Sequence, residues 1–198
     1  MVNIAAVVLA AGFSRRMGRP KMILPWGDTT VIGQVVEVLQ QAGLEEIVVV
    51  TGSARQEVEL ALRHRHVRCI FNQLYTEDNM AISLQVGLSA LADSVEAALV
   101  VLGDQPQIAC EVVARLVQAF EKTRAKLIVP SYQQRRGHPW LVARSAWPAI
   151  LALGPQETLR SFLNAYEAWI EYLPVESDTV LRDLDTPEDY SRERPLPA

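Results

Sequence analysis

Cysteines are scarce in this sequence, and long apolar runs are missing. Among its 198 residues are two cysteines, Cys69 and Cys110, which lie far apart and outside any CxxC or metal-ligand spacing. We therefore interpret them as small buried hydrophobic residues, not as a disulfide, a redox pair or a zinc site. No stretch approaches the roughly 18 apolar residues of a membrane span, and no basic segment precedes the apolar N-terminal run as it does in signal peptides. We expect a cytoplasmic protein with no membrane partner.

An excess of positive charge is also missing. Lysine and arginine total 19 against 23 aspartate and glutamate residues, which gives a formal net charge of -4 at pH 7. Such a balance does not favour binding to nucleic acid, and we expect no nucleic-acid partner. Hydrophobic residues make up 49% of the chain and charged residues 21%. This composition is ordinary for a globular protein, and the length suits one domain with a sizeable core.

Apolar runs alternate with amphipathic segments along most of the chain. Strands are predicted over residues 4–10, 46–51, 67–71, 97–102, 126–130 and 139–142, and helices over 29–42, 54–63, 79–91, 111–122, 146–152 and 158–168. The alternation is typical of βαβ units, so we expect an α/β fold: one domain with three layers, Rossmann-like, with a mainly parallel central sheet. That domain is predicted over residues 1–191, followed by a frayed tail over 192–198.

The most informative stretch is the one that follows the first predicted strand, LAAGFSRRMGRPK at residues 9–21. Small residues let backbone N–H groups approach an anion closely, and arginine and lysine neutralise its charge. The stretch is neither a Walker A loop nor a GxGxxG loop. We predict a loop that binds a polyphosphate, the alternative being a basic surface loop. The predicted nucleotide contacts are Leu9, Ala10, Ala11, Gly12, Ser14 and Lys21, and the predicted catalytic cations are Arg15, Arg16 and Lys21.

Two acidic segments complete the candidate site. Asp104 follows the predicted strand 97–102 directly, and a carboxylate there suits Mg²⁺, which takes one or two carboxylates plus phosphate and water oxygens. Asp183 and Asp185 lie in RDLDTPEDY, where Asp185 or Thr186 is also suited to cap a helix. Because parallel strands carry ligands beyond their carboxyl ends, Asp104 and the basic loop are expected to face one crevice.

These motifs, taken together, resemble a known family. LAAGxSxRMGxxK, LPWGDTTVIGQVV, SLQVGL, GDQP, RGHP and DLDTPEDY follow in the order found in molybdenum cofactor cytidylyltransferases, which belong to the nucleotidyltransferase superfamily. The resemblance covers nearly the whole chain. It implies a nucleotidyltransferase fold and transfer of CMP from CTP to the terminal phosphate of a molybdopterin-type cofactor, with release of pyrophosphate. It also implies Mg²⁺, with Mn²⁺ as an alternative, and a molybdenum enzyme as a candidate recipient of the product.

The resemblance assigns roles to the later motifs. It implies that Asp185 is the second metal ligand beside Asp104, with Asp183 in reserve. Ser83 lies on the segment that contacts the base and ribose in the family. Arg136 and His138, in RGHP, lie where the phosphorylated pterin acceptor is expected to enter. Residues 1–130 would thus form mainly the nucleotide-binding half, and residues 131–191 mainly the acceptor half.

The choice of base depends on the start of the basic loop. Guanylyl-transferring relatives typically carry a glycine pair where this chain has Ala10 and Ala11. Added methyl groups are expected to narrow the base pocket and favour a pyrimidine. Two alternatives stay open: a transferase that uses GTP or ATP with another phosphorylated small molecule, and a non-catalytic carrier of the molybdenum cofactor. A carrier needs no pair of metal carboxylates, so Asp104 and Asp185 argue against the second.

Overall fold

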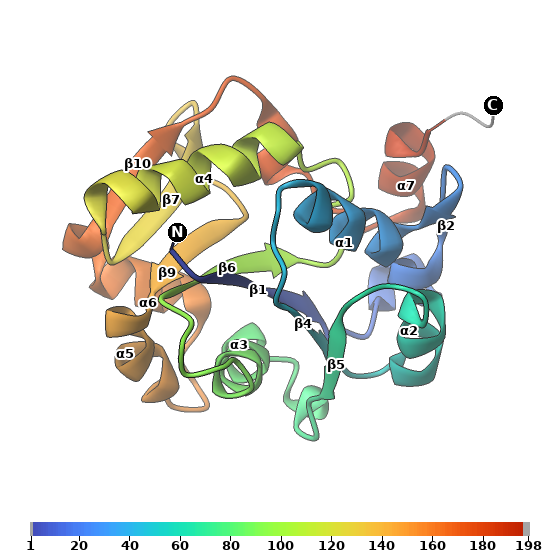
Figure 1. Ribbon diagram of the computed structural model, residues 1–198. Helices are drawn as coiled ribbons and strands as arrows, with labels where there is room; N and C mark the ends of the chain where they lie inside the picture. The colour runs from blue at the N-terminus through green and yellow to red at the C-terminus, as the bar shows by residue number, and fades with distance from the viewer. Residues whose placement is uncertain (1, 196–198) are drawn as a thin grey trace.

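One sheet lies between two layers of helices (Figure 1). The computed structural model describes residues 2–195. Along the sheet the strands follow the order β10-β7-β9-β6-β1-β4-β5, and the short β8 pairs with β7. The strands of this sheet are β1 (Ile4–Ala10), β4 (Ile47–Thr51), β5 (Arg68–Phe71), β6 (Ala97–Leu102), β7 (Leu127–Tyr132), β8 (Arg135–Arg136), β9 (Trp140–Ala143) and β10 (Ile170–Pro174). The α-helices are α1 (Val31–Gln41), α2 (Arg55–Leu62), α3 (Met80–Ser89), α4 (Cys110–Thr123), α5 (Trp147–Leu151), α6 (Leu159–Ala165) and α7 (Pro187–Glu193).

Most strands of the sheet run in the same direction. β1 pairs in parallel with both β4 and β6, β4 with β5, and β7 with β10. Among the described strands of this sheet, only β9 and the two-residue β8 run against their neighbours. The prediction of a mainly parallel α/β sheet in one domain is therefore confirmed. The carboxyl ends of β1 and β6 lie side by side at the centre of the sheet, the place where an open α/β sheet binds its ligand.

The core is built on both faces of the sheet. All seven residues of β1 are buried, because this central strand is covered by helices on either side. Successive side chains of a strand point to opposite faces. Thus Val8 and Ala10 pack with α1, α2 and α4, whereas Val7 and Leu9 pack with α3, α5 and α6. Cys69 and Cys110 are free and partly buried on the first of these faces.

The predicted elements are present, with boundaries shifted by a few residues. The helix predicted from residue 29 begins at Val31, because Thr29–Thr30 form the short strand β3, which pairs with β2 (Pro25–Trp26). Thr30 then caps α1, its hydroxyl oxygen accepting from the backbone N–H of Gly33 at 3.1 Å. β10, which forms an edge of the sheet, was not predicted from the sequence. Its residues are half-buried or exposed, so they lack the apolar signal of a central strand.

The predicted tail needs a correction. Arg192 and Glu193 belong to α7 and form ion pairs, so the ordered chain continues past residue 191. Residues 196–198 of that tail lie outside the described residues. α7 lies beside β2 in Figure 1, where the Tyr190 hydroxyl donates a hydrogen bond to the carbonyl oxygen of Pro25 at 2.6 Å. Among residues 2–195, no helix is both long and apolar enough to cross a bilayer.

A minor core lies beneath the basic loop, separate from the two faces of the sheet. It joins residues from the first part of the chain to residues from the last, and it fixes the loop to α7. Its members are Met17, Leu24, Trp26, Val31, Leu184 and Tyr190.

Candidate active site

A cavity of about 540 Å³ opens beyond the carboxyl ends of β1 and β6. Its volume lies within the range of roughly 300–1,000 Å³ that is usual for small-molecule sites. The structure brings most of the predicted site residues to its wall: Leu9, Ala11, Gly12, Ser14, Arg15, Arg16, Lys21, Ser83, Asp104, Asp183 and Asp185. The cavity therefore joins the basic loop to both acidic segments, although these lie far apart in the sequence.

The basic loop is shaped so that its cations reach the cavity. Ser14 adopts a left-handed backbone conformation with φ of 53°, and Gly18 does the same with φ of 69°. Between them Met17 turns inward into the minor core, which leaves the arginines before it outside. The Ser14 hydroxyl oxygen accepts from the backbone N–H of Lys21 at 3.2 Å. Ser14 thus holds the loop closed and fixes the residue that carries the most buried cation of the site.

Lys21 lies between the two predicted metal ligands. Its Nζ is 2.5 Å from Oδ2 of Asp104 and 3.1 Å from Oδ1 of Asp185. The side chains of Lys21 and Asp104 are only 11% and 15% exposed. Burial on its own lowers the pKa of Lys21, but the charges and hydrogen bonds of Asp104 and Asp185 outweigh it, and the net effect is a raised pKa. The lysine is therefore charged at neutral pH.

The same two carboxylates fit a divalent cation. They already converge on one positive charge, and carboxylate oxygen is the donor that Mg²⁺ and Mn²⁺ prefer. Within residues 2–195 there is no group of three or more His, Cys, Asp or Glu side chains arranged to hold a metal. The described chain thus offers a pair of ligands. A pair is what Mg²⁺ uses where phosphate and water oxygens complete its coordination.

Asp183 borders the cavity but is engaged differently. Its Oδ1 accepts from Nε2 of Gln105 at 2.6 Å, and the side chain of Gln105 is buried. Asp183 is exposed to solvent as a residue. The protein around its carboxylate nevertheless removes much of the hydration of that group. That loss, with the added charge of Asp104, raises the pKa of Asp183 to about 6.

The two arginines lie at the rim. Nη2 of Arg16 is 2.7 Å from Oδ2 of Asp185, and the Arg16 side chain is largely exposed. Arg15 lies over the ring of Phe13, 4.8 Å from its centroid, and 3.7 Å from the carboxylate of Asp78. Both can reach an anion in the cavity by rotating exposed side chains. Adjacent arginines thus take different partners.

Ser83 and Asn79 lie on the opposite wall, at the start of α3. The Ser83 hydroxyl oxygen accepts from Nδ2 of the buried Asn72 at 3.1 Å. Asn79 caps α3 and donates to the carbonyl oxygens of Pro155 and Glu157, so its amide is used to hold a neighbouring loop.

Sequence reasoning missed the aromatic part of this wall. Phe13 and Tyr75 both border the cavity, with ring centroids 5.4 Å apart. No periodic signal marks Tyr75, because it sits in a single 3-10 turn between β5 and α3.

Three predicted residues lie elsewhere. Ala10 packs in the core and is not among the residues that line the cavity, so its methyl group does not narrow a base pocket. Arg136 is ion-paired to Glu167 at 2.8 Å and hydrogen-bonded to Asn164 at 2.7 Å. His138 is half-buried, and burial lowers its pKa to about 4, which leaves the imidazole neutral at neutral pH. Neither Arg136 nor His138 is among the residues that line the cavity, so their role toward the acceptor stays a prediction.

A small-residue loop after β1, a lysine, a carboxylate after β6 and a second carboxylate before α7 meet in one cavity, an arrangement that suits nucleotidyl transfer. The family model described as "MobA-like NTP transferase domain" matches residues 6–169. The chain belongs to this family and is a nucleotidyltransferase.

Two curated relatives match over almost their whole length. The chain is 28% identical to nicotine blue oxidoreductase of Paenarthrobacter nicotinovorans, over 96% of this chain and 95% of that protein. It is 24% identical to molybdenum cofactor cytidylyltransferase of Escherichia coli (strain K12), over 96% and 95%. Among solved structures, a Mycobacterium tuberculosis H37Rv protein in complex with manganese is 27% identical, with a TM-score of 0.80 over 96% of this chain and 97% of the other. The expected fold is thereby confirmed.

Proposed function

We propose that the protein transfers CMP from CTP to the terminal phosphate of a molybdopterin-type cofactor and releases pyrophosphate. The observation that carries the reaction class is the convergence of Lys21, Asp104 and Asp185 in one cavity. The similarity to the Escherichia coli cytidylyltransferase supports the choice of donor and acceptor. A nucleoside triphosphate donor also fits a cytoplasmic location, and a molybdenum enzyme is the proposed recipient of the product.

The proposed reaction is a direct displacement. An acceptor phosphate oxygen attacks the α-phosphorus of CTP, the bond from the α-phosphorus to the bridging oxygen breaks, and that oxygen leaves with pyrophosphate. Asp104 and Asp185 would hold Mg²⁺ or Mn²⁺, which when bound neutralises phosphate charge and orients the triphosphate. Lys21 and Arg16, which pair with these carboxylates, would offset the negative charge that develops on the phosphoryl oxygens and the leaving group.

Pyrimidine preference is argued from Ala11. Ala11 lines the cavity at the end of β1, and a methyl group added at Gly52 would overlap the carbonyl oxygen of Ala11. The backbone of Ala11 is therefore closely packed against Gly52, which follows β4, and this packing supports a preference for a smaller base. The cavity wall comes from residues 9–104 together with Asp183 and Asp185. This supports the proposal that residues 1–130 form mainly the nucleotide-binding half of the domain.

Thermal shift with CTP, UTP, GTP and ATP, each with and without Mg²⁺ or Mn²⁺, tests the donor. A ligand stabilises the folded state by RT ln(1 + [L]/Kd), so the preferred nucleotide gives the largest shift. We expect CTP with metal to lead, and Asp104→Ala to lose the effect. Pyrophosphate release with CTP and molybdopterin then tests the acceptor. A preference for GTP or ATP would overturn the cytidylyl assignment, whereas no response to any nucleotide would favour a carrier.

The similarity to nicotine blue oxidoreductase gives a second candidate, a redox reaction on an aromatic heterocycle. Phe13 and Tyr75 at the cavity supply a surface on which such a ring could stack. NADH and NADPH belong in the same thermal-shift series. Stabilisation by a reduced nicotinamide nucleotide without metal, unchanged in Asp104→Ala, would favour this candidate over nucleotidyl transfer.

A further inference from the structure

Asp185 needs support from outside the sheet. Asp104 directly follows the central strand β6, but Asp185 lies on an irregular segment, residues 182–186, between a 3-10 turn and α7. The middle of this segment is tied to the other carboxylate, because the backbone N–H of Leu184 donates to the carbonyl oxygen of Asp104 at 3.1 Å. The side chain of Leu184 is fully buried in the minor core. The two ends of the segment have to be fixed by other groups.

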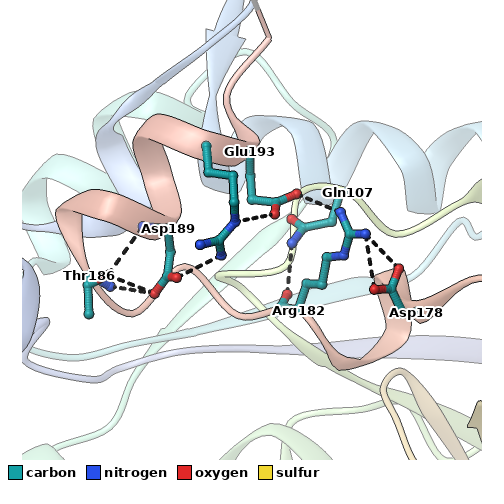
Figure 2. A network of polar contacts seen from close by, with 7 residues as sticks. Gln107, Asp178, Arg182, Thr186, Asp189 and Glu193 are labelled. Carbon is teal, nitrogen blue, oxygen red and sulfur yellow. Dashed lines mark hydrogen bonds and ion pairs between the residues drawn. The ribbon is translucent and has the colours of Figure 1, made fainter.

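A chain of polar contacts fixes both ends (Figure 2). Before Asp185, Nη1 of Arg182 is 2.9 Å from Oε2 of Glu193, and Nη2 is 2.8 Å from Oδ1 of Asp178. The carbonyl oxygen of Arg182 accepts from Nε2 of Gln107 at 2.9 Å. The guanidinium and the backbone of Arg182 are thus both held.

After Asp185, Thr186 begins α7 with a reciprocal cap. Its backbone N–H donates to Oδ2 of Asp189 at 3.0 Å, and the N–H of Asp189 donates to the Thr186 hydroxyl at 3.2 Å. Arg192 joins the two ends, since it contacts Oδ1 of Asp189 at 2.8 Å and Oε1 of Glu193 at 3.0 Å. Glu193 is the residue through which both ends are connected.

We propose that Glu193, acting through Arg182 and Arg192, positions Asp185 to hold the divalent cation. The side chain of Glu193 is only 11% exposed, in contrast to most ion-pairing carboxylates of this surface. Glu193 does not line the cavity, so we interpret it as a positioning residue. The position of Asp185 determines whether two carboxylates can share one cation. Loss of Glu193 should therefore lower the affinity for the metal in particular. This inference rests on the proposed metal-dependent transfer.

The test is Mn²⁺ binding to the full chain with saturating CTP and no acceptor, measured by the electron paramagnetic resonance of free Mn²⁺ relative to the same CTP concentration without protein. GTP and ATP serve as further arms. Glu193→Gln keeps the shape of the side chain and removes its charge. We expect it to raise the Kd of Mn²⁺ about three- to tenfold, below the range typical of groups bonded directly to a ligand. The affinity for CTP without metal should be unchanged.

Glu37→Gln is the matched control. Glu37 forms an ion pair with Arg65 at 2.9 Å on α1, away from the cavity wall, and its loss should leave Mn²⁺ binding unchanged. Asp178→Asn removes the other anchor of Arg182 and gives a second test should Glu193→Gln fail to fold. In the double variant Arg182→Gln/Glu193→Gln the effect should be smaller than the sum of the two single effects, because the two residues share one ion pair.

The outcomes are distinguishable. If both Glu193→Gln and Asp178→Asn bind Mn²⁺ within about twofold of the wild type while their melting temperatures fall, Glu193 has only a structural role and the inference is overturned. If the wild type itself takes up no Mn²⁺ with any nucleotide, the proposed function fails, and this inference fails with it.

Discussion

Asp104 and Asp185 offer the same functional group to the same lysine, but they are supported in different ways. Asp104 follows β6, whose backbone is hydrogen-bonded on both sides to other strands. Asp185 lies on a segment held by side chains: the cap at Thr186, the guanidinium of Arg182 and the buried Leu184. A sheet positions a metal-binding side chain through main-chain hydrogen bonds, so many different sequences can hold such a side chain in place. A side-chain network fixes a ligand only while each of its members is present.

The largest effect is expected from Asp104→Asn. The substitution keeps the size of the side chain and removes one of two carboxylates, so we expect nucleotidyl transfer to fall on the order of 10³-fold. Unfolding in urea should show a modest loss of stability, because Lys21 loses its shorter ion pair but keeps Asp185 as a partner. Steady-state pyrophosphate release and urea melts measure the two quantities. A rate within tenfold of the wild type would remove Asp104 from the catalytic site.

Lys21→Gln comes next, with an expected loss of about 10²-fold in rate. The variant also leaves Asp104 and Asp185 facing each other without the ammonium group between them. We therefore expect the metal-free variant to be less stable than the wild type, and added Mn²⁺ to recover part of the difference. Thermal melts with and without Mn²⁺ measure this. Equal destabilisation in both conditions would mean that the lysine acts through packing alone.

Leu184→Ala should affect Asp185, which is held by side chains, and spare Asp104, which is held by the sheet. Truncating this fully buried side chain opens a cavity in the minor core and is expected to cost about 2–4 kcal/mol in the free energy of unfolding. Activity should fall about tenfold, an effect mainly on metal affinity. Leu163→Ala, in the core on the α6 face, is the matched comparison. If both variants lose the same activity, Leu184 has no particular link to Asp185.

The smallest effect is expected from Asp183→Asn. The pKa of Asp183 is raised to about 6 in the folded protein, above its ordinary value of 3.8, so the folded state binds a proton that the unfolded state has released between these values. This carboxyl therefore makes the protein less stable as the pH rises from about 4 to 6. The variant should gain stability relative to the wild type across that window, by about 1 kcal/mol or less because solvent screens the site. Urea melts at pH 4.5 and 7 test this, and an unchanged difference would contradict it.

The sequence predicted the site best where the functional side chains follow directly on a strongly predicted strand. The apolar run of β6 followed by Gly103 and Asp104 predicts both a strand and a ligand, and the basic loop after β1 predicts an anion site. Both belong to the central parallel strands, where burial gives a strong signal. The residues that hold these groups in place gave a weaker signal.

Arg136 shows why the rest could not be predicted. In the sequence it is a cation in a loop, and its partners Asn164 and Glu167 become neighbours only after the chain has folded. Ala10 and Ala11 are adjacent, yet the alternation of a strand sends one methyl group into the core and leaves the other at the cavity. Whether a polar side chain pairs with other residues of the chain or stays available for a ligand depends on residues that lie far away in the sequence.

The minor core has a consequence for the order in which this protein is made. Met17, which anchors the basic loop, is synthesised long before its partners Leu184 and Tyr190. Until they arrive, one side of Met17 has no apolar partner and the second carboxylate is missing. A partly synthesised chain can therefore form the central sheet, but it cannot yet assemble the complete site. Catalytic competence is acquired only once α7 has been synthesised and packs beneath the basic loop.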